Sequence, residues 1–135
     1  MFEVHSVEDL QEISNKTSWQ YFEKLVAFIF EENGFDVEQN KVFVKKENKK
    51  IEKRQYDVIA KKNDITYLIE CKKWKRSNSF KAAIEKHNER CEFYSKLYPE
   101  EQVYPLLVNF MERNNMIEEE IPIVPLFGLN RFLNK

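Results

Sequence analysis

Three residues that could do chemistry together, Asp57, Glu70 and Lys72, lie close to one another in the sequence. They belong to two strings with alternating apolar residues, RQYDVIAKK and ITYLIECKK, which are joined by Asn63-Asp64. This pattern predicts two strands connected by a two-residue turn. In the register that such a turn sets, Asp57 pairs with Glu70, and Lys72 points to the same face as Glu70. Like charges directly opposite on a sheet are destabilising, so the pair predicts a cation between the two carboxylates.

Hydrolysis of a phosphodiester by metal-activated water requires this kind of set. Mg²⁺ takes hard oxygen ligands, which Asp57, Glu70 and the main-chain carbonyl of Cys71 can supply. Lys72, held beside the carboxylates, can position the water and neutralise the negative charge that develops on the phosphate. The structural alternatives are an exposed strand acid at Asp57 and a surface ion pair between Glu70 and Lys72.

A third acidic candidate, Glu23, lies on a helix predicted over about residues 18–33. The apolar residues of this segment recur at helical spacing and predict a buried face. Glu23 falls among Val26 and Phe30 on that face, where a solvated glutamate is not expected. We therefore expect Glu23 to contribute to the site. The alternative is a boundary residue paired with a nearby lysine.

Positive charge is concentrated in the middle of the chain, although the net charge is −1. Residues 41–76 contain thirteen Lys or Arg and five acids, a net of +8, whereas residues 1–40 contain two and nine, a net of −7. The remaining residues, 77–135, contain seven and nine, a net of −2. A basic segment around the carboxylates is where a phosphate backbone would bind. The expected DNA contacts are Lys45, Lys46, Arg54, Lys73, Trp74, Lys75 and Arg76, with Trp74 available for base stacking. A solvated lysine-rich surface is the alternative for the charge run, and packing at the edge of the core is the alternative for Trp74.

The rest of the sequence predicts one domain, residues 1–135, built around a mixed sheet. The two hairpin strands are apolar on both faces, which is typical of a sheet covered by helices on both sides. Pro105 indicates an edge or bulge position in its strand. The predicted helices begin at Ser6, at about Ser18 and at about Ser79, with a short one at NRFL, and the predicted strands span 35–46, 54–61, 65–71, 103–110 and 121–127. Residues 47–53 are expected to form a loop or an exposed turn, and 111–120 to include a helical turn.

Composition restricts the compartment and the cofactor. The chain has no apolar run near the ~20 residues of a membrane span, and its first residues lack the features of a signal peptide. Cys71 and Cys91 are therefore expected to be reduced, buried thiols of a cytoplasmic protein, with Cys71 facing away from Glu70. His5 and His87 have no partner pattern for zinc, and His87 is expected to face solvent or to have its hydrogen bonds satisfied.

Asp57 followed by Glu70-Cys71-Lys72 resembles the PD-(D/E)xK motif of the restriction-endonuclease-like superfamily, with Tyr56 in place of the proline. The predicted order of helix, three strands, helix and strand is similar to the αβββαβ core of that α/β fold. Residues 17–110 contain WQYFEKLVAFIFEENGF, DVIA and YLIECKK. They most resemble the archaeal Holliday-junction resolvases and the nuclease domain of enzymes that restrict modified DNA.

This resemblance implies a homodimeric DNA endonuclease that uses Mg²⁺, with Mn²⁺ as a substitute, and acts on branched or modified DNA. It also implies that Glu23 helps to hold the metal. The chain lacks the basic N-terminal segment and the Gly/Ser-containing loop of those resolvases, and the Gln-x-x-x-Tyr arrangement of RecB-like exonucleases. The alternatives are a catalytically inactive DNA-binding or scaffold module with the same fold, and an interaction domain unrelated to nucleic acids.

Overall fold

The protein is described here by a computed structural model, which covers residues 19–72, 80–109, 116–118 and 121–134. The helix expected to begin at Ser6, the carboxyl end of the 103–110 strand and the basic residues 73–76 lie outside the described residues. In chain order the elements are α2 (Trp19–Glu32), β1 (Asp36–Glu47), β2 (Lys50–Lys62), β3 (Ile65–Lys72), α3 (Phe80–Leu97), β4 (Gln102–Asn109), β5 (Met116–Glu118), β6 (Ile121–Pro125), the 3₁₀ turn η2 (Leu126–Gly128) and α4 (Leu129–Leu133).

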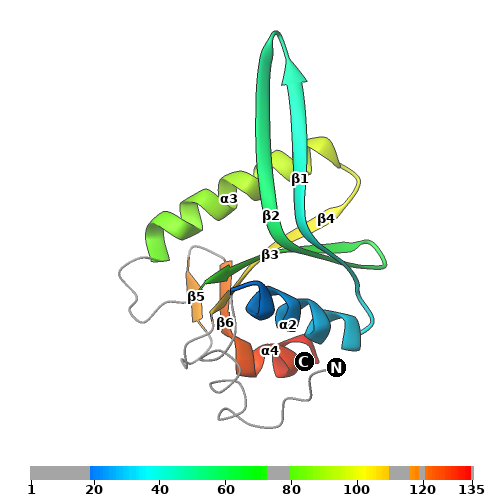
Figure 1. Ribbon diagram of the computed structural model, residues 1–135, viewed down its shortest axis with the longest axis vertical. Helices are drawn as coiled ribbons and strands as arrows, with labels where there is room; N and C mark the ends of the chain where they lie inside the picture. The colour runs from blue at the N-terminus through cyan, green and yellow to red at the C-terminus, as the bar shows by residue number, and fades with distance from the viewer. Residues whose placement is uncertain (1–18, 73–79, 110–115, 119–120, 135) are drawn as a thin grey trace.

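A mixed six-stranded sheet, in the order β1-β2-β3-β4-β6-β5, forms the centre of the molecule. Pairing is antiparallel for β1–β2, β2–β3 and β5–β6, and parallel for β3–β4 and β4–β6. The parallel β3–β4 pair requires a crossover, which α3 provides. The expected αβββαβ core is therefore confirmed (Figure 1).

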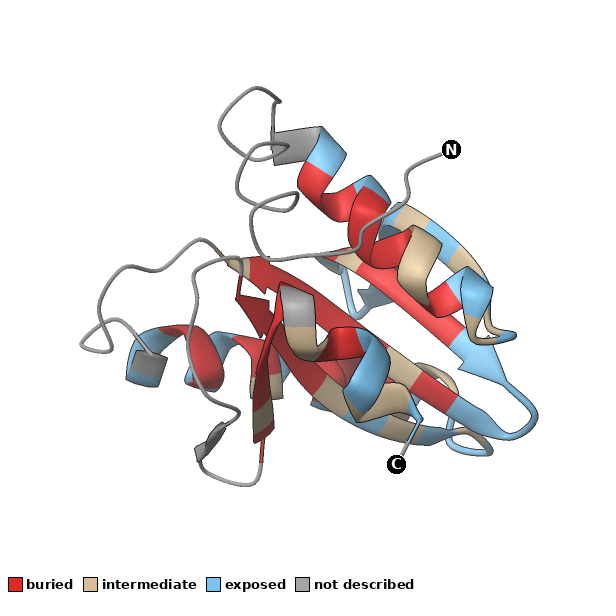
Figure 2. Cartoon of the chain, turned by 90° about the horizontal axis from the view of Figure 1, so that it is seen from below, coloured by how far each residue is buried: buried red, intermediate tan, exposed pale blue. Residues whose placement is uncertain are grey.

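Helices cover both faces of the sheet, because side chains alternate along the buried strands. In β4, Leu106 and Val108 join the core beneath α2 and α4, whereas Leu107 joins a cluster with Ile84 of α3. In the hairpin, Val58 packs on the α2 side and Ile59 on the α3 side, as expected. Figure 2 shows the buried residues gathered on the central strands and on the helix sides that face them.

The end of α2 shows why this helix stops where it does. Gly34 has φ +86°, a left-handed conformation that L-residues with a side chain rarely adopt. This conformation lets the Gly34 amide donate to the Glu31 carbonyl, and the Phe35 amide donate to the Phe30 carbonyl at 3.1 Å. Phe35 then packs edge-on against Phe30, with ring centroids 5.1 Å apart. The predicted helix boundary is confirmed.

Residues 47–53 were expected to form a loop or an exposed turn; a turn is present, but a loop of this length is wrong. Strand β2 begins at Lys50, and the connection shrinks to Asn48 and Lys49, whose φ angles are +49° and +69°. Two successive left-handed residues are the requirement of the tight hairpin turn that matches strand twist. The result is a long β1–β2 hairpin that projects from the body of the molecule (Figure 1). Residues 47–53 lack an apolar alternation because this part of the hairpin covers no core.

The chain after β4 contains a strand that the sequence did not predict. Of residues 111–120, which were expected to include a helical turn, the structure describes 116–118, and these form the short strand β5, which pairs with β6. A three-residue strand is stabilised by its neighbour rather than by its own sequence. Pro105 lies in the part of β4 that pairs with β3 alone, which is a local edge position. None of the helices in the described ranges has the length and apolarity to cross a membrane.

Candidate active site

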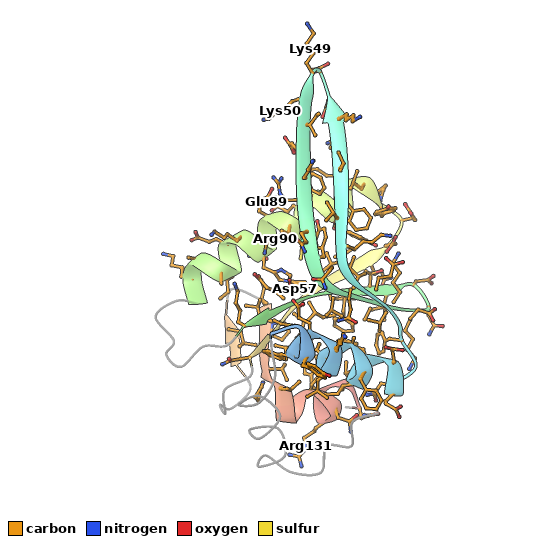
Figure 3. All side chains as sticks on the ribbon, in the orientation of Figure 1. Lys49, Lys50, Asp57, Glu89, Arg90 and Arg131 are labelled. Carbon is orange, nitrogen blue, oxygen red and sulfur yellow. The ribbon has the colours of Figure 1, made fainter. Side chains whose placement is uncertain are left out.

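Asp57 lies where β2 separates from β3. The β2–β3 pairs run from Lys62↔Ile65 to Val58↔Ile69, in the predicted register, but the ladder ends at Val58, so the predicted pair between Asp57 and Glu70 is not formed. The β1–β2 ladder also skips this position, and the residue opposite, Asn40, has φ +52°. Asp57 is therefore released from both ladders at the base of the projecting hairpin (Figure 3). Beyond this point β3 continues through Lys72 beside β4 only.

The carboxylate of Asp57 turns into the gap that this separation leaves. The Cys71 amide has no main-chain partner in β2, and it donates instead to the side chain of Asp57, at Oδ2 and 3.0 Å. Burial raises the pKa of Asp57, and the charge of Glu70 raises it further, while the Cys71 amide and the cations of Arg90 and Lys72 oppose the shift. Asp57 is thus a half-buried carboxylate rather than the exposed strand acid of the alternative interpretation.

Glu70 is buried, with 7% of its surface exposed, and it is held by two cations. Its Oε1 accepts from Arg90 Nη1 at 3.0 Å and lies 3.2 Å from Lys72 Nζ. The Glu70–Lys72 pair is therefore not a surface ion pair, although 35% of the Lys72 side chain is exposed. Arg90 comes from α3, so the second cation reaches the site from a helix that passes over this face of the sheet.

His87 was expected to face solvent or to have its hydrogen bonds satisfied, and the first alternative is wrong, since only 1% of it is exposed. A carbonyl oxygen can only accept, so Nε2–H donates to the Leu68 carbonyl at 2.8 Å. Burial lowers the pKa of His87, which makes Nδ1 of the neutral ring an acceptor. Nδ1 lies 3.6 Å from Glu70 Oε2, and neither atom has a hydrogen-bond partner among the described residues.

Glu23 and Cys71 lie on the α2 side of the sheet, opposite the α3 side from which Arg90 and His87 approach Glu70. Glu23 is 5% exposed on α2, as a site residue on the buried face would be. Cys71 packs in the α2-side core, as expected, and both cysteines are free and buried. Burial raises the pKa of the Cys71 thiol, and the charges of Asp57, Glu23 and Glu70 raise it further. Three carboxylates therefore surround the carboxyl end of β3.

Arg90 and His87 were missed in the sequence, but a signal for them existed. His87, Cys91 and Tyr94 follow Ile84 at helical spacing, and all four are buried. Arg90, one turn after His87, borders the same face. A polar residue on an apolar helix face is the signal that identified Glu23. Applied to α3, it would have identified His87 as well.

The expected DNA contacts separate into three groups. Lys45 and Arg54 are ion-paired, with Glu47 at 3.4 Å and with Glu89 respectively, and Arg54 Nε donates to both Glu89 oxygens. Lys46 is exposed and forms no ion pair with any residue that the structure describes. Lys73, Trp74, Lys75 and Arg76 lie outside the described residues.

The donor atoms at this site fit Mg²⁺, although the protein forms no complete cage for it. No group of three His, Cys, Asp or Glu side chains within the described ranges is arranged to hold a metal ion. Mg²⁺ does not require one, because it is usually bound through one or two carboxylates with waters and substrate phosphates completing the shell. Asp57 and Glu70 supply two carboxylates, and Glu70 Oε2 is a buried acceptor without a hydrogen-bond partner.

Comparisons with known proteins agree with this fold. The structure is similar to the small subunit (R.BspD6I2) of the heterodimeric restriction endonuclease R.BspD6I, with a TM-score of 0.62 and 14% identity over 95% of this chain and 75% of that one. It is also similar to the protein of unknown function AF1548, with a TM-score of 0.61 and 18% identity over 80% of this chain. A third similar structure is VC1899 from Vibrio cholerae, with a TM-score of 0.55 and 14% identity over 94% of this chain. The chain spans only 58% of AF1548 and 34% of VC1899.

The family is established by sequence. No curated protein matches the chain. A family model named Mrr_cat and described as "Restriction endonuclease" matches residues 14–89, which is more than half of the chain and includes Glu23, Asp57, Glu70, Lys72 and His87. The fold of the similar structures agrees with that match. The chain therefore belongs to the restriction endonuclease family, within the restriction-endonuclease-like superfamily.

Proposed function

We propose that this protein is a metal-dependent DNA endonuclease that hydrolyses phosphodiester bonds where β2 separates from β3 at Asp57, a place called here the fork. The observation that carries the proposal is the convergence of Asp57, Glu70 and Lys72 where the two strands separate. Family membership supports a nuclease. The fork supports a location, because the separation leaves the main-chain groups of Cys71 without the β2 main-chain partners that a continuous ladder would provide.

Asp57, Glu70 and the Cys71 carbonyl are the proposed metal ligands, with Mg²⁺ as the physiological ion and Mn²⁺ as a substitute. The amide and carbonyl of one residue in an extended strand point to the same side. Because the Cys71 amide points at Asp57, the Cys71 carbonyl faces the same gap. A bound Mg²⁺ would act as a Lewis acid on the phosphate and lower the pKa of water. Glu23, buried on α2 near the same strand end, is proposed to support this ligand set.

Lys72 and Arg90 have different proposed roles. Both contact Glu70 Oε1, but Lys72 is on the strand end that borders the gap, whereas Arg90 approaches from α3. Lys72 can therefore move from Glu70 to the phosphate, orienting the attacking water and neutralising the developing charge. Arg90 keeps the Glu70 carboxylate in place when Lys72 leaves it. His87, packed against Oε2, restricts Glu70 from the other side.

Several finer expectations stay predictions. Branched or modified DNA as substrate, the homodimer and the cytoplasmic location are supported by sequence resemblance and composition alone. The single domain of residues 1–135 likewise stays a prediction. The similar R.BspD6I2 is the small subunit of a heterodimer. Association with a different subunit is therefore an outcome that a test of the homodimer must include.

The direct test is cleavage of a substrate panel by the purified chain in Mg²⁺, in Mn²⁺ and in EDTA. The panel contains supercoiled plasmid, linear duplex, flapped DNA and four-way junctions. We expect cutting of at least one form that stops in EDTA, and the preferred form identifies the substrate class. No cutting of any form, together with salt-sensitive DNA binding, would replace the proposal with a DNA-binding module. No binding at all would indicate an interaction domain unrelated to nucleic acids.

Lys72→Met should lower the cleavage rate by about 10²–10³-fold, because one preorganised cation at the phosphate is lost. Mg²⁺ should still raise the melting temperature of this variant, since the proposed ligands remain. Lys61→Met is the matched control. Lys61 also borders a glutamate, Glu101, at 3.5 Å, but it lies near the β2–β3 turn, at the end of these strands away from Asp57. Equal rates for the two variants would exclude the proposed role of Lys72.

A further inference from the structure

The projecting part of the β1–β2 hairpin has two faces with different surroundings. The register pairs Val42 with Gln55, Val44 with Lys53 and Lys46 with Ile51, so these six side chains share one face, called here the outer face. All six are exposed, and the three apolar ones are exposed by 51%, 46% and 58% for Val42, Val44 and Ile51. No element in the described part of the chain covers the outer face.

The opposite face is anchored to α3. Phe43 packs against the rings of Tyr56, Tyr94 and Tyr98, with centroids 5.5–5.7 Å apart. Directly across from Phe43, Arg54 is bonded to Glu89 and lies over the Phe93 ring at 4.9 Å. These contacts fix the direction of the hairpin relative to the body, so the outer face is presented by a held scaffold. Figure 3 shows Glu89 and Arg90 beside the hairpin and Lys49 at its tip.

Charge is distributed unequally between the faces. Residues 41–56 contain seven Lys or Arg and two acids. Both acids, Glu47 and Glu52, lie on the α3-side face, where they pair with Lys45 at 3.4 Å and with Lys50 at 3.5 Å. The outer face contains Lys46 and Lys53 and no acid. Neither lysine forms an ion pair within the described residues.

We infer that the outer face of the hairpin binds in the major groove of duplex DNA, next to the site of cleavage. A major groove about 12 Å wide admits a two-stranded ribbon. Lys46 and Lys53 would contact phosphates at the groove walls, and Val42, Val44 and Ile51 would contact base edges, where the apolar group available is the thymine methyl. Packing of two hairpins through this face is disfavoured, because it would bring four lysines together without an acid.

The length of the hairpin sets the scale of the contact. Eight residues separate Asp57 from Lys49, which corresponds to about 26 Å at ~3.3 Å per residue. One turn of duplex covers about 34 Å in about 10 base pairs. The hairpin can therefore reach bases as far as about eight base pairs from the phosphate at Asp57. The inference depends on the proposed DNA substrate, but it concerns a binding surface separate from the proposed metal ligands.

The test measures binding without cleavage, so that failure of the nuclease proposal and failure of this inference are distinguished. Anisotropy of a labelled 24-base-pair duplex in EDTA gives the affinity at several salt concentrations. Lys46→Ala/Lys53→Ala should weaken binding and reduce the slope of log K against log [salt] by about 2, because each lost phosphate contact contributes about 0.9. The control is Lys41→Ala/Lys50→Ala, which removes the same charge from the other face and should leave the slope nearly unchanged. Equal effects of the two variants, or none, would overturn the inference.

Two further measurements distinguish binding in the major groove from binding elsewhere on the duplex and from self-association. Val44→Ser/Ile51→Ser should weaken binding without changing the salt slope, since no phosphate contact is lost. Methyl green, which occupies the major groove, should displace the wild-type protein, whereas netropsin, which fills the minor groove, should not. Sedimentation of all variants reports self-association: a shift toward monomer in the outer-face variants alone would show that a second copy occupies this face. Melting temperatures close to that of the wild type show that each variant is folded.

Discussion

Asp57→Asn should abolish cleavage, by about 10³-fold or more, without destabilising the protein in metal-free buffer. The loss of rate follows from removal of a proposed metal ligand whose charge stabilisation is worth several kcal/mol. The fold is preserved because the amide oxygen of Asn can still accept from the Cys71 amide, as Asp57 Oδ2 does at 3.0 Å. Rates on plasmid and thermal melts of the same preparations measure both effects.

The pH dependence of that stability follows from the direction of the pKa shift. Burial raises the pKa of Asp57 in the folded protein, so folding disfavours the ionised carboxylate. The resulting destabilisation is complete above the folded-state pKa, and it disappears as pH falls below the ordinary Asp pKa of about 3.9. The Asn variant should therefore melt higher than the wild type near pH 7, and this advantage should vanish in acid.

Magnesium supplies the decisive comparison. A ligand that binds only the folded state stabilises it by about 2.7 kcal/mol at 100 times its dissociation constant. Mg²⁺ should therefore raise the melting temperature of the wild type, and this gain should be reduced or absent for Asp57→Asn. An Asn variant that keeps both the Mg²⁺ effect and cleavage would show that Asp57 is not a ligand. A melting temperature well below that of the wild type would show instead that Asp57 is structural.

Arg90→Met should lower the free energy of unfolding by about 1–2 kcal/mol, because it removes one of two cations from the buried Glu70 carboxylate. Met keeps the length of the side chain and much of its packing. In the double variant with Glu70→Gln the cost should be largely recovered, since the buried charge is gone. Urea denaturation of the four proteins should give a coupling energy of at least about 1 kcal/mol.

The exposed pair Arg54–Glu89 is the matched control for this cycle. It also joins an arginine to a glutamate between the sheet and α3, here from β2, but half of the Glu89 side chain is exposed. Exposed pairs typically contribute less than about 1 kcal/mol, so Arg54→Met and Glu89→Gln should couple weakly. Equal coupling in the two cycles would show that Arg90 acts as an ordinary surface charge and does not hold Glu70 in place.

Local patterns identified much of the scaffold. Alternating apolar residues around Asn63-Asp64 set the register that the structure shows, because a tight turn leaves little choice of pairing. Gly34 and Phe35 marked the end of α2 through backbone chemistry that is local. Local patterns did not identify the strand residues 50–53 and 116–118. These segments are strands because a neighbouring strand pairs with them, and neither carries an apolar period of its own.

The sequence by itself was enough to select Asp57, Glu70 and Lys72 as candidates and to predict the two strands on which they lie. Strand alternation and turn geometry act over a few residues, so a local pattern carries this information. Only the tertiary structure decided that β2 leaves β3 at Asp57, because that separation depends on where β1, β4 and the helices pack. It also brought Arg90 and His87 to Glu70, across twenty and seventeen positions of the chain. Contacts between an α3 side chain and a β3 carboxylate depend on how the crossover helix lies on the sheet, and no local pattern specifies that placement.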